Sequence, residues 1–149
     1  YSMNNMINFI DSLDKSWQIL IFGALGNEEQ KIIKLCNNKI NRHVISSDYN
    51  LEQQMAIMSN LDVMISMDSA NGHIASLFGI DVITIWGATH PNSGYGPLKQ
   101  PKENSIVPDL NKYPDLPVTI YGSDCPTNYV EAINTIKYER ILERLNKII

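Results

Sequence analysis

The sequence has few of the residues that build cross-linked or metal-binding domains. Its 149 residues include only two cysteines, Cys36 and Cys125, which make neither a disulfide framework nor a metal-ligand spacing. No apolar run approaches the ~20 residues that a membrane-spanning helix needs, and no secretory signal pattern opens the chain. These absences favour a cytosolic protein without disulfides, a bound metal or a transmembrane segment.

Positive charge is also scarce. Twelve Lys and Arg residues stand against 16 Asp and Glu residues, which gives a formal net charge of −4. A broad nucleic-acid footprint or a polybasic membrane patch needs a basic excess, so we expect no nucleic-acid partner. A local anion site built from backbone N–H groups is not excluded. The hydrophobic fraction of 44% and the chain length fit one globular domain with a sizeable core.

Apolar periodicity predicts helices and strands in alternation, an α/β pattern typical of a Rossmann-like, doubly wound parallel sheet. No strand precedes the first predicted helix, so the chain begins part-way through this pattern. Helices are expected over residues 3–14, 28–38, 51–60, 70–78, 127–134 and 138–147, and strands over residues 17–22, 44–47, 62–67, 82–86, 105–107 and 118–121.

Two of the helices carry local signals. Asn50 and Gln53 have the spacing of a capping box before the helix over 51–60, and Gly79 is suited to end the short helix before it. Large apolar residues at helical spacing predict the buried stripes. These stripes are Leu51, Met55 and Met58 in one helix, and Ile74, Leu77 and Phe78 in the other.

Residues 62–97 hold the stretch around which the chain is organised. One apolar strand empties into a polar turn at 68–73, and the next strand empties into a turn at 87–91. Two strands joined by a short helix form a βαβ unit, whose strands pair in parallel through a right-handed crossover. Both turns are therefore expected at the carboxyl ends of neighbouring strands, where open α/β sheets bind ligands.

The first turn has the composition of an anion site. A helix N-terminus carries unpaired N–H groups and a partial positive charge. The small residues Ser69, Ala70 and Gly72 would let a diphosphate or carboxylate approach that backbone. Asp68 is expected to face sideways, towards backbone N–H groups or a sugar hydroxyl, while a helix N-cap role stays equally open. His73 either donates to a phosphate oxygen or packs against the sheet.

Other chemistries fit less well. Gly23 and Gly26 are too loosely spaced for a phosphate-binding glycine fingerprint. Glu28 follows the first strand, where it suits either the helix dipole or the hydroxyls of a ribose. Ser69 lacks the glycine-x-serine-x-glycine elbow of a nucleophile. No metal site is expected, because no known ligand spacing matches Asp68, His73 and His90.

Two runs of residues together carry a family resemblance. They are Asp68-Ser69-Ala70-Asn71-Gly72-His73-Ile74-Ala75 and, after an apolar strand, Gly87-Ala88-Thr89-His90-Pro91. This pair resembles the signature of glycosyltransferase family 9, the heptosyltransferase family of lipopolysaccharide synthesis. Its members typically read Asp-Thr-Gly-x-x-His-x-Ala and then Gly-x-Thr-x-Pro. The resemblance covers about residues 17–97, and Ser69 and Ala70 replace the usual threonine and glycine.

The resemblance implies that residues 1–149 are one nucleotide-sugar-binding, Rossmann-like domain, the C-terminal half of a GT-B glycosyltransferase. It implies a diphosphate cradle in the first turn and an acidic ribose ligand after the first strand, where Glu28 is the best candidate and Asn27 competes. The implied substrate-binding residues are Glu28, Asp68, Ser69, Ala70, Asn71, Gly72, His73 and Thr89.

The implied reaction moves a sugar, heptose in the usual case, from an ADP-linked donor to a lipid-linked glycan acceptor in lipopolysaccharide synthesis. It uses neither a metal nor another cofactor, and it implies a cytoplasmic location, with peripheral attachment at the inner membrane as an option. The N-terminal acceptor domain and the family's proposed catalytic Asp lie outside this chain, so the fragment alone is expected to be inactive. A non-catalytic nucleotide- or anion-binding module, or another nucleotide-sugar enzyme such as an epimerase, are the alternatives.

Overall fold

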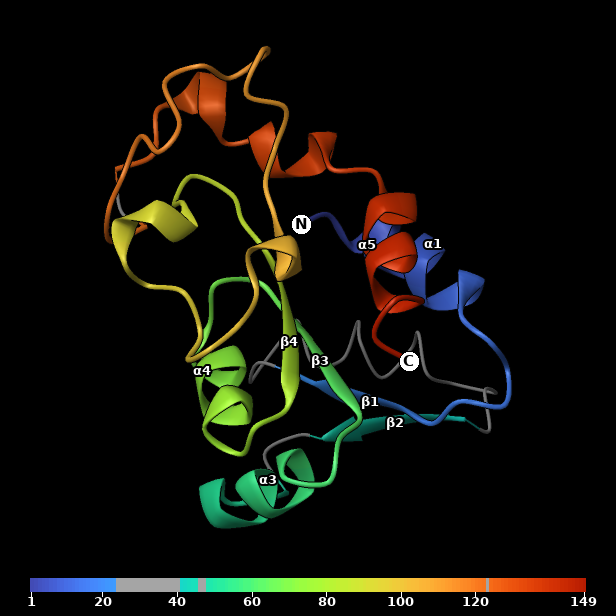
Figure 1. Ribbon diagram of the computed structural model, residues 1–149. Helices are drawn as coiled ribbons and strands as arrows, with labels where there is room; N and C mark the ends of the chain where they lie inside the picture. The colour runs from blue at the N-terminus through green and yellow to red at the C-terminus, as the bar shows by residue number, and fades with distance from the viewer. Residues whose placement is uncertain (24–40, 46–47, 123) are drawn as a thin grey trace.

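The computed structural model describes residues 1–23, 41–45, 48–122 and 124–149, which form a mixed α/β arrangement (Figure 1). The predicted helix over 28–38 lies outside the described residues. The helices are α1 (Met3–Ser12), α3 (Leu51–Met58), α4 (Ala70–Leu77) and α5 (Tyr138–Leu145). The strands are β1 (Ile19–Phe22), β2 (Arg42–Ile45), β3 (Val63–Ser66), β4 (Asp81–Ile85) and β5 (Ser105–Ile106). Short 3₁₀ turns are η1 (Pro91–Ser93), η2 (Lys102–Asn104), η3 (Thr127–Tyr129) and η4 (Ala132–Thr135).

The described strands form two parallel sheets. One has the order β1–β2, and the other has the order β3–β4–β5. Val63 lies opposite Asp81, so β3, α4 and β4 make the predicted parallel βαβ unit. These parallel strands are compatible with the predicted Rossmann-like fold, although β1 and β3 belong to separate sheets in the described part of the chain. Side chains of both strands, such as Ile21 and Ile65, instead pack against one shared core.

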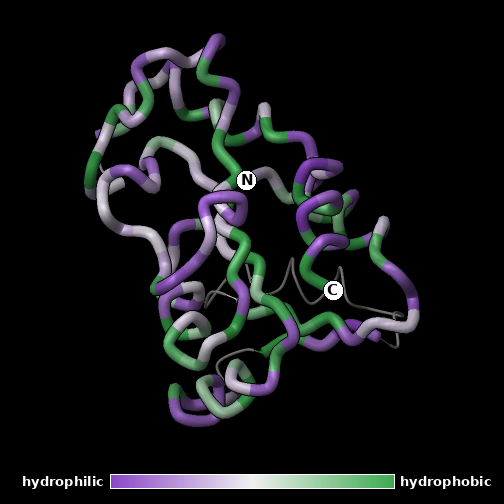
Figure 2. Tube along the Cα trace, viewed as in Figure 1, coloured by the Kyte–Doolittle hydropathy of each residue, from purple (hydrophilic) through white to green (hydrophobic). Residues whose placement is uncertain are grey.

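Helices cover the sheets on both sides. α1 and α5 lie together on one side, and α4 lies on the other (Figure 1). The hydrophobic segments at the centre of the molecule coincide with the strands (Figure 2). β4 is buried from Val82 to Ile85, as expected for a parallel strand covered on both faces. The larger core cluster consists of Phe9, Ile10, Ile83, Ile85, Ile106, Ile136, Ile141 and Leu145.

The predicted start of α3 and the predicted end of α4 are confirmed. The Asn50 side chain accepts from the Gln53 amide, and the Gln53 side chain accepts from the Asn50 amide, each at 2.9 Å. Gly79 follows α4 with φ of +79°, a conformation that glycine adopts without a Cβ clash. Its amide donates to the Ser76 carbonyl, and the next amide donates to the Ala75 carbonyl. This pair of bonds closes the helix as a Schellman motif.

The predicted buried stripes are wrong in part. Leu77 is 68% exposed and Phe78 is 41% exposed, whereas α4 buries Gly72, Ala75 and Ser76. Small residues face the strands because they let the short helix lie close to β3 and β4. On α3, Met58 is fully buried as predicted, but Leu51 at the first helical position is 61% exposed.

The last third of the chain is less regular than predicted. Residues 127–134 form the 3₁₀ turns η3 and η4 rather than one α-helix. Residues 118–121 form no strand, and Val118 makes a single backbone bond, to Ala88. Ile120 and Tyr121 are exposed, so this stretch does not bury an apolar face as a strand of the core would. The short strand β5 and helix α5 are confirmed. No helix among the described residues is long and apolar enough to cross a membrane.

Two truncations on α3 test the corrected packing. Met58→Ala should lower the free energy of unfolding by about 2–5 kcal/mol, because it opens a cavity beneath a fully buried side chain. Leu51→Ala should change it by less than about 0.5 kcal/mol, because most of that side chain is already in water. Urea unfolding of both variants makes the comparison. Equal losses would contradict this orientation of α3.

Candidate functional site

The two polar turns meet at the carboxyl ends of β3 and β4. The Thr89 hydroxyl Oγ1 donates to Asp68 Oδ2 across 2.6 Å. Thr89 is buried, and Asp68 is half-buried. The parallel register of β3 and β4 sets the turns side by side, and this hydrogen bond joins them. The prediction that both turns lie at one edge of a parallel sheet is confirmed.

Asp68 is held in an uncommon backbone conformation. Its φ is +24°, which residues with a Cβ rarely adopt. Such a conformation costs about 1–3 kcal/mol and persists only where neighbouring contacts impose it. The short, charge-assisted bond from Thr89 is one such contact. The N-cap interpretation of Asp68 is wrong, because Ser69 occupies that position. The partner of the carboxylate is the Thr89 hydroxyl rather than the backbone N–H groups of its own turn that the sequence suggested.

The mouth of α4, defined here as Ser69, Ala70 and Asn71, retains free donors. Ser69 is the N-cap, yet its side chain makes no capping bond and instead lies 2.9 Å from Ser66 Oγ. The Gly72 amide donates to the Ser69 carbonyl at 3.1 Å. Within the described chain, the Ala70 and Asn71 amides have no acceptor, as expected for the first turn of a helix. Ser69 and Ala70 are exposed, so this mouth is open to solvent.

Gly72 acts beneath the mouth rather than at its surface. It is buried, and a Cβ at this position would lie 2.7 Å from Ser66 Oγ and 2.9 Å from Ser66 Cβ. Only glycine therefore permits this distance between α4 and β3. Sequence reasoning missed Ser66, which both limits residue 72 and contacts Ser69. The one available signal was a small polar residue near the end of an otherwise apolar strand.

Several groups near the mouth make local hydrogen bonds. His73 is half-buried, and its carbonyl accepts from Ser76 Oγ at 2.7 Å. The same Ser76 oxygen accepts from the Leu98 amide, which ties α4 to the loop after η1. His90 caps η1, because its Nδ1 accepts from the Asn92 amide. Among the described residues, no group of three or more His, Cys, Asp or Glu side chains is arranged to hold a metal ion.

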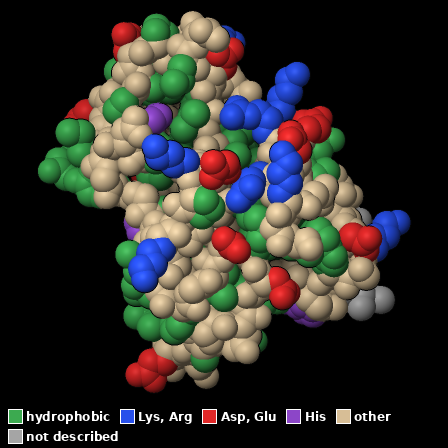
Figure 3. Space-filling view, viewed as in Figure 1, with side chains coloured by type: hydrophobic (Ala, Val, Ile, Leu, Met, Phe, Trp, Pro, Cys, Tyr) green, Lys and Arg blue, Asp and Glu red, His purple; other side chains and the backbone are tan. Residues whose placement is uncertain are grey.

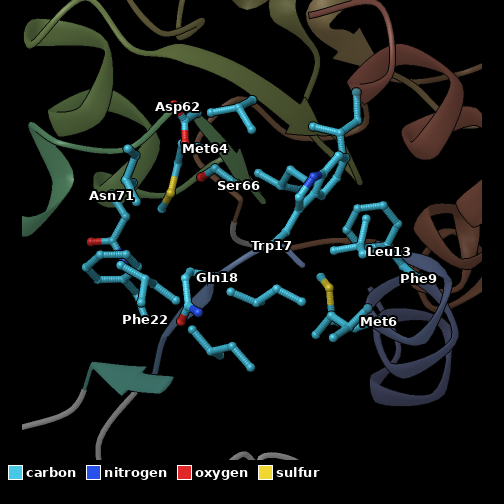
Figure 4. Close-up of a pocket in the computed structure, with 18 of the residues that line it drawn as sticks. Met6, Phe9, Leu13, Trp17, Gln18, Phe22, Asp62, Met64, Ser66 and Asn71 are labelled. Atoms are coloured by element: carbon cyan, nitrogen blue, oxygen red, sulfur yellow. The ribbon is translucent and has the colours of Figure 1, made fainter. Parts of the chain in front are cut away.

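A cavity of about 660 Å³ adjoins the mouth (Figure 4). Ser66, Ser69 and Asn71 line it near the carboxyl end of β3. Most of its remaining lining is apolar and comes from α1, β1 and β3, with α1 side chains such as Phe9 and Leu13 on the side opposite Asn71. The predicted ribose ligand Glu28 and its competitor Asn27 lie outside the described residues. The other predicted site residues lie in or beside the two joined turns.

Basic side chains gather elsewhere, over α5 and η2, beside acidic ones (Figure 3). We call Arg140, Arg144 and Lys147, which line one shallow pocket, the α5 basic surface. All three side chains have protein partners. Arg140 donates to the Val107 carbonyl, Arg144 donates to Asn104 Oδ1, and Lys147 pairs with Glu143. This surface is therefore engaged in holding α5 and its neighbours, in contrast to the open mouth of α4.

Gly72→Ala tests the close approach of α4 to β3. Alanine favours a helix over glycine by about 1 kcal/mol, so relief of backbone entropy alone would stabilise the variant. We expect a net loss of about 1–3 kcal/mol in the free energy of unfolding, because the new methyl group overlaps Ser66. Gly96→Ala is the control, since no atom lies within 4 Å of its Cβ position. A Gly72→Ala variant as stable as that control would contradict the packing.

One of three comparisons with known proteins identifies a family for this chain. A family model described as glycosyltransferase family 9 (heptosyltransferase) matches residues 10–121, a range that contains both turns and α4. No curated protein and no solved structure matches the chain. The resemblance drawn from the two motifs is confirmed. Because the matched range spans well over half of the sequence, the chain belongs to glycosyltransferase family 9, the heptosyltransferase family.

Proposed function

We propose that this chain is the donor-binding, C-terminal half of a GT-B glycosyltransferase, in which the mouth of α4 holds the diphosphate of a nucleotide-sugar. The observation that carries the proposal is the Thr89–Asp68 hydrogen bond. It joins both family motifs at one edge of the sheet and leaves the Ala70 and Asn71 amides free beside them. Residues 1–149 would then act as one nucleotide-sugar-binding domain.

The local electrostatics support an anionic group at this mouth. The N-terminus of a helix carries roughly half a positive charge, and its free amides point outward. Ser69 adds a hydroxyl, and the Asn71 side chain adds an amide donor next to it. The neighbouring carboxylate of Asp68 already accepts a hydrogen bond from the Thr89 hydroxyl, which orients it towards the second turn. A diphosphate that approaches the mouth would therefore contact hydrogen-bond donors before it contacts the Asp68 carboxylate.

The mouth also suits the chemistry of sugar transfer. As the bond between the sugar and the diphosphate breaks, negative charge grows on the leaving phosphate oxygen. Fixed donors aimed at that oxygen stabilise the transition state without reorganising. Ser69, Ala70 and Asn71 would supply such donors, with His73 one turn further along α4 and Gly72 keeping the helix close to β3. We assign no catalytic base to these residues.

The donor that we propose is ADP-heptose or a close analogue, with Glu28 on the ribose, and the acceptor is a lipid-linked glycan of lipopolysaccharide synthesis. The acceptor domain and the catalytic Asp would come from polypeptide outside residues 1–149, so this domain alone would bind donor without turnover. The proposed location is the cytoplasm, at the inner face of the membrane where such acceptors are assembled. Membership of the family supports these assignments, which rest on the same mouth.

Calorimetric titration of the full-length protein with an ADP-sugar tests the proposal. Ala70→Glu places a carboxylate at the first residue of α4, where it favours the helix dipole but repels a diphosphate. We expect this variant to keep its thermal stability and to bind the ADP-sugar at least about tenfold more weakly, a change worth about 1.4 kcal/mol. Ala56→Glu, at an exposed position of α3, is the matched control and should bind as the unmodified protein does.

Four outcomes would overturn the assignment. If no nucleotide-sugar binds, or if both variants bind it equally well, the mouth of α4 does not hold the diphosphate. Bare ADP binding as tightly as the ADP-sugar, with no sugar transfer to any glycan acceptor, would favour a non-catalytic module. Conversion of the donor to an isomer without an acceptor would favour an epimerase.

A further inference from the structure

Ser69 occupies the N-cap of α4 but does not cap the helix. Its backbone is extended, with φ of −134° and ψ of 161°, as the backbone of an N-cap residue usually is. A serine in this position normally accepts a hydrogen bond from the second or third helical amide, here that of Asn71 or Gly72. Ser2 does so for α1, where its hydroxyl accepts from the Asn5 amide at 3.3 Å. The Ser69 side chain makes no such bond.

Ser66 accounts for the position of the Ser69 hydroxyl. Ser66 is the last residue of β3 (Figure 4), and its Oγ lies 2.9 Å from Ser69 Oγ. Ser66 is only 6% exposed, and the pairing of β3 with β4 sets it opposite Thr84. Gly72 passes so close that a Cβ there would lie 2.7 Å from Ser66 Oγ. The Ser66 hydroxyl is therefore confined between Gly72 and Ser69.

The contact between the two serines decides which amides stay available. The Ser69 hydroxyl bonds to Ser66 rather than to the first turn of its own helix. The Ala70 and Asn71 amides accordingly have no acceptor within the described chain. A capping hydroxyl would occupy the position that an anion takes at a helix N-terminus. Capping by Ser69 and binding of a diphosphate are therefore competing uses of the same donors.

The pair of hydroxyls also gains a direction when an anion is present. A diphosphate offers acceptors, so a hydroxyl that binds it has to donate. Ser69 has a single hydroxyl proton, and with that proton on the diphosphate Ser69 can only accept from Ser66. Ser66 would then donate to Ser69, and Ser69 would donate to the anion. Such a chain of hydrogen bonds strengthens each of its members.

We propose that Ser66 is a positioning residue for the mouth of α4. It holds the Ser69 hydroxyl away from the helix amides, which leaves those amides to the diphosphate, and it turns the Ser69 proton towards the same ligand. Ser66 acts through Ser69 and needs no contact with the ligand. The identity of the ligand rests on the proposed function, whereas the competition between a capped and an open mouth is a property of the unliganded protein.

Ser66→Ala tests the proposal in the full-length protein. Without the Ser66 hydroxyl, Ser69 should turn back and cap α4, so the unfolding temperature should not fall. In the unliganded variant, hydrogen exchange measured by NMR should slow at least about threefold at the Asn71 or Gly72 amide, which a cap would engage. Calorimetric titration should show ADP binding about fivefold more weakly, the factor that a serine cap contributes to a helix equilibrium.

A second background makes the test specific. In Ser69→Ala no hydroxyl remains to cap α4, so adding Ser66→Ala should change neither the amide exchange nor the affinity for ADP. A role of Ser66 in packing alone would weaken binding equally in both backgrounds. Ser59→Ala, at the exposed end of α3, is the control for loss of a hydroxyl elsewhere and should behave as the unmodified protein does.

The outcomes separate this proposal from the proposed function. Unchanged exchange at Asn71 and Gly72 in Ser66→Ala would overturn the positioning role. An unchanged affinity for ADP, or an equal loss with and without the Ser69 hydroxyl, would also overturn it. If the unmodified protein binds no ADP but Ser66→Ala still slows the exchange, Ser66 holds Ser69 off the helix as proposed, and the placement of the diphosphate at the mouth of α4 is wrong.

Discussion

One hydrogen bond, from the Thr89 hydroxyl to the Asp68 carboxylate, fixes the relation between the two turns on which the site depends. Parallel pairing of β3 with β4 brings the two turns to the same edge of the sheet. The register of the strands alone would not fix the conformation of either turn. The bond holds Asp68 at positive φ and turns its charge towards the second motif. Ser69 can then begin α4 without a side-chain cap, which leaves the first amides of the helix open to a ligand.

The same region shows why small residues matter on both sides of a helix–strand contact. Gly72 packs on Ser66, and the Ser66 hydroxyl in turn reaches Ser69 at the mouth. The position of the mouth therefore depends on the close contact between α4 and β3 as well as on the turn that contains Asp68. Ser66 and Ser69 also line the cavity that adjoins the mouth.

Local signals in the sequence predicted much of this fold. Apolar runs followed by turns identified β3 and β4, and the Asn50–Gln53 spacing identified a capping box, because these features depend on neighbours in the chain. Interactions between residues far apart in the chain could not be predicted from the sequence. The predicted buried stripe through Leu77 is wrong because the prediction was based on the spacing of large apolar residues. Helix α4 instead packs on the strands through small residues. The Thr89–Asp68 bond and the separation of the two sheets arise only from tertiary structure, and Glu28 lies outside the described residues.

The most direct test of the account follows backbone amide signals by NMR while inorganic pyrophosphate is added to the isotopically labelled protein. The account predicts saturable shifts that are largest for Ala70 and Asn71 and that weaken as salt screens the partial charge of the helix. Shifts centred on the α5 basic surface, around Arg140 and Arg144, with Ala70 and Asn71 unchanged, would contradict it.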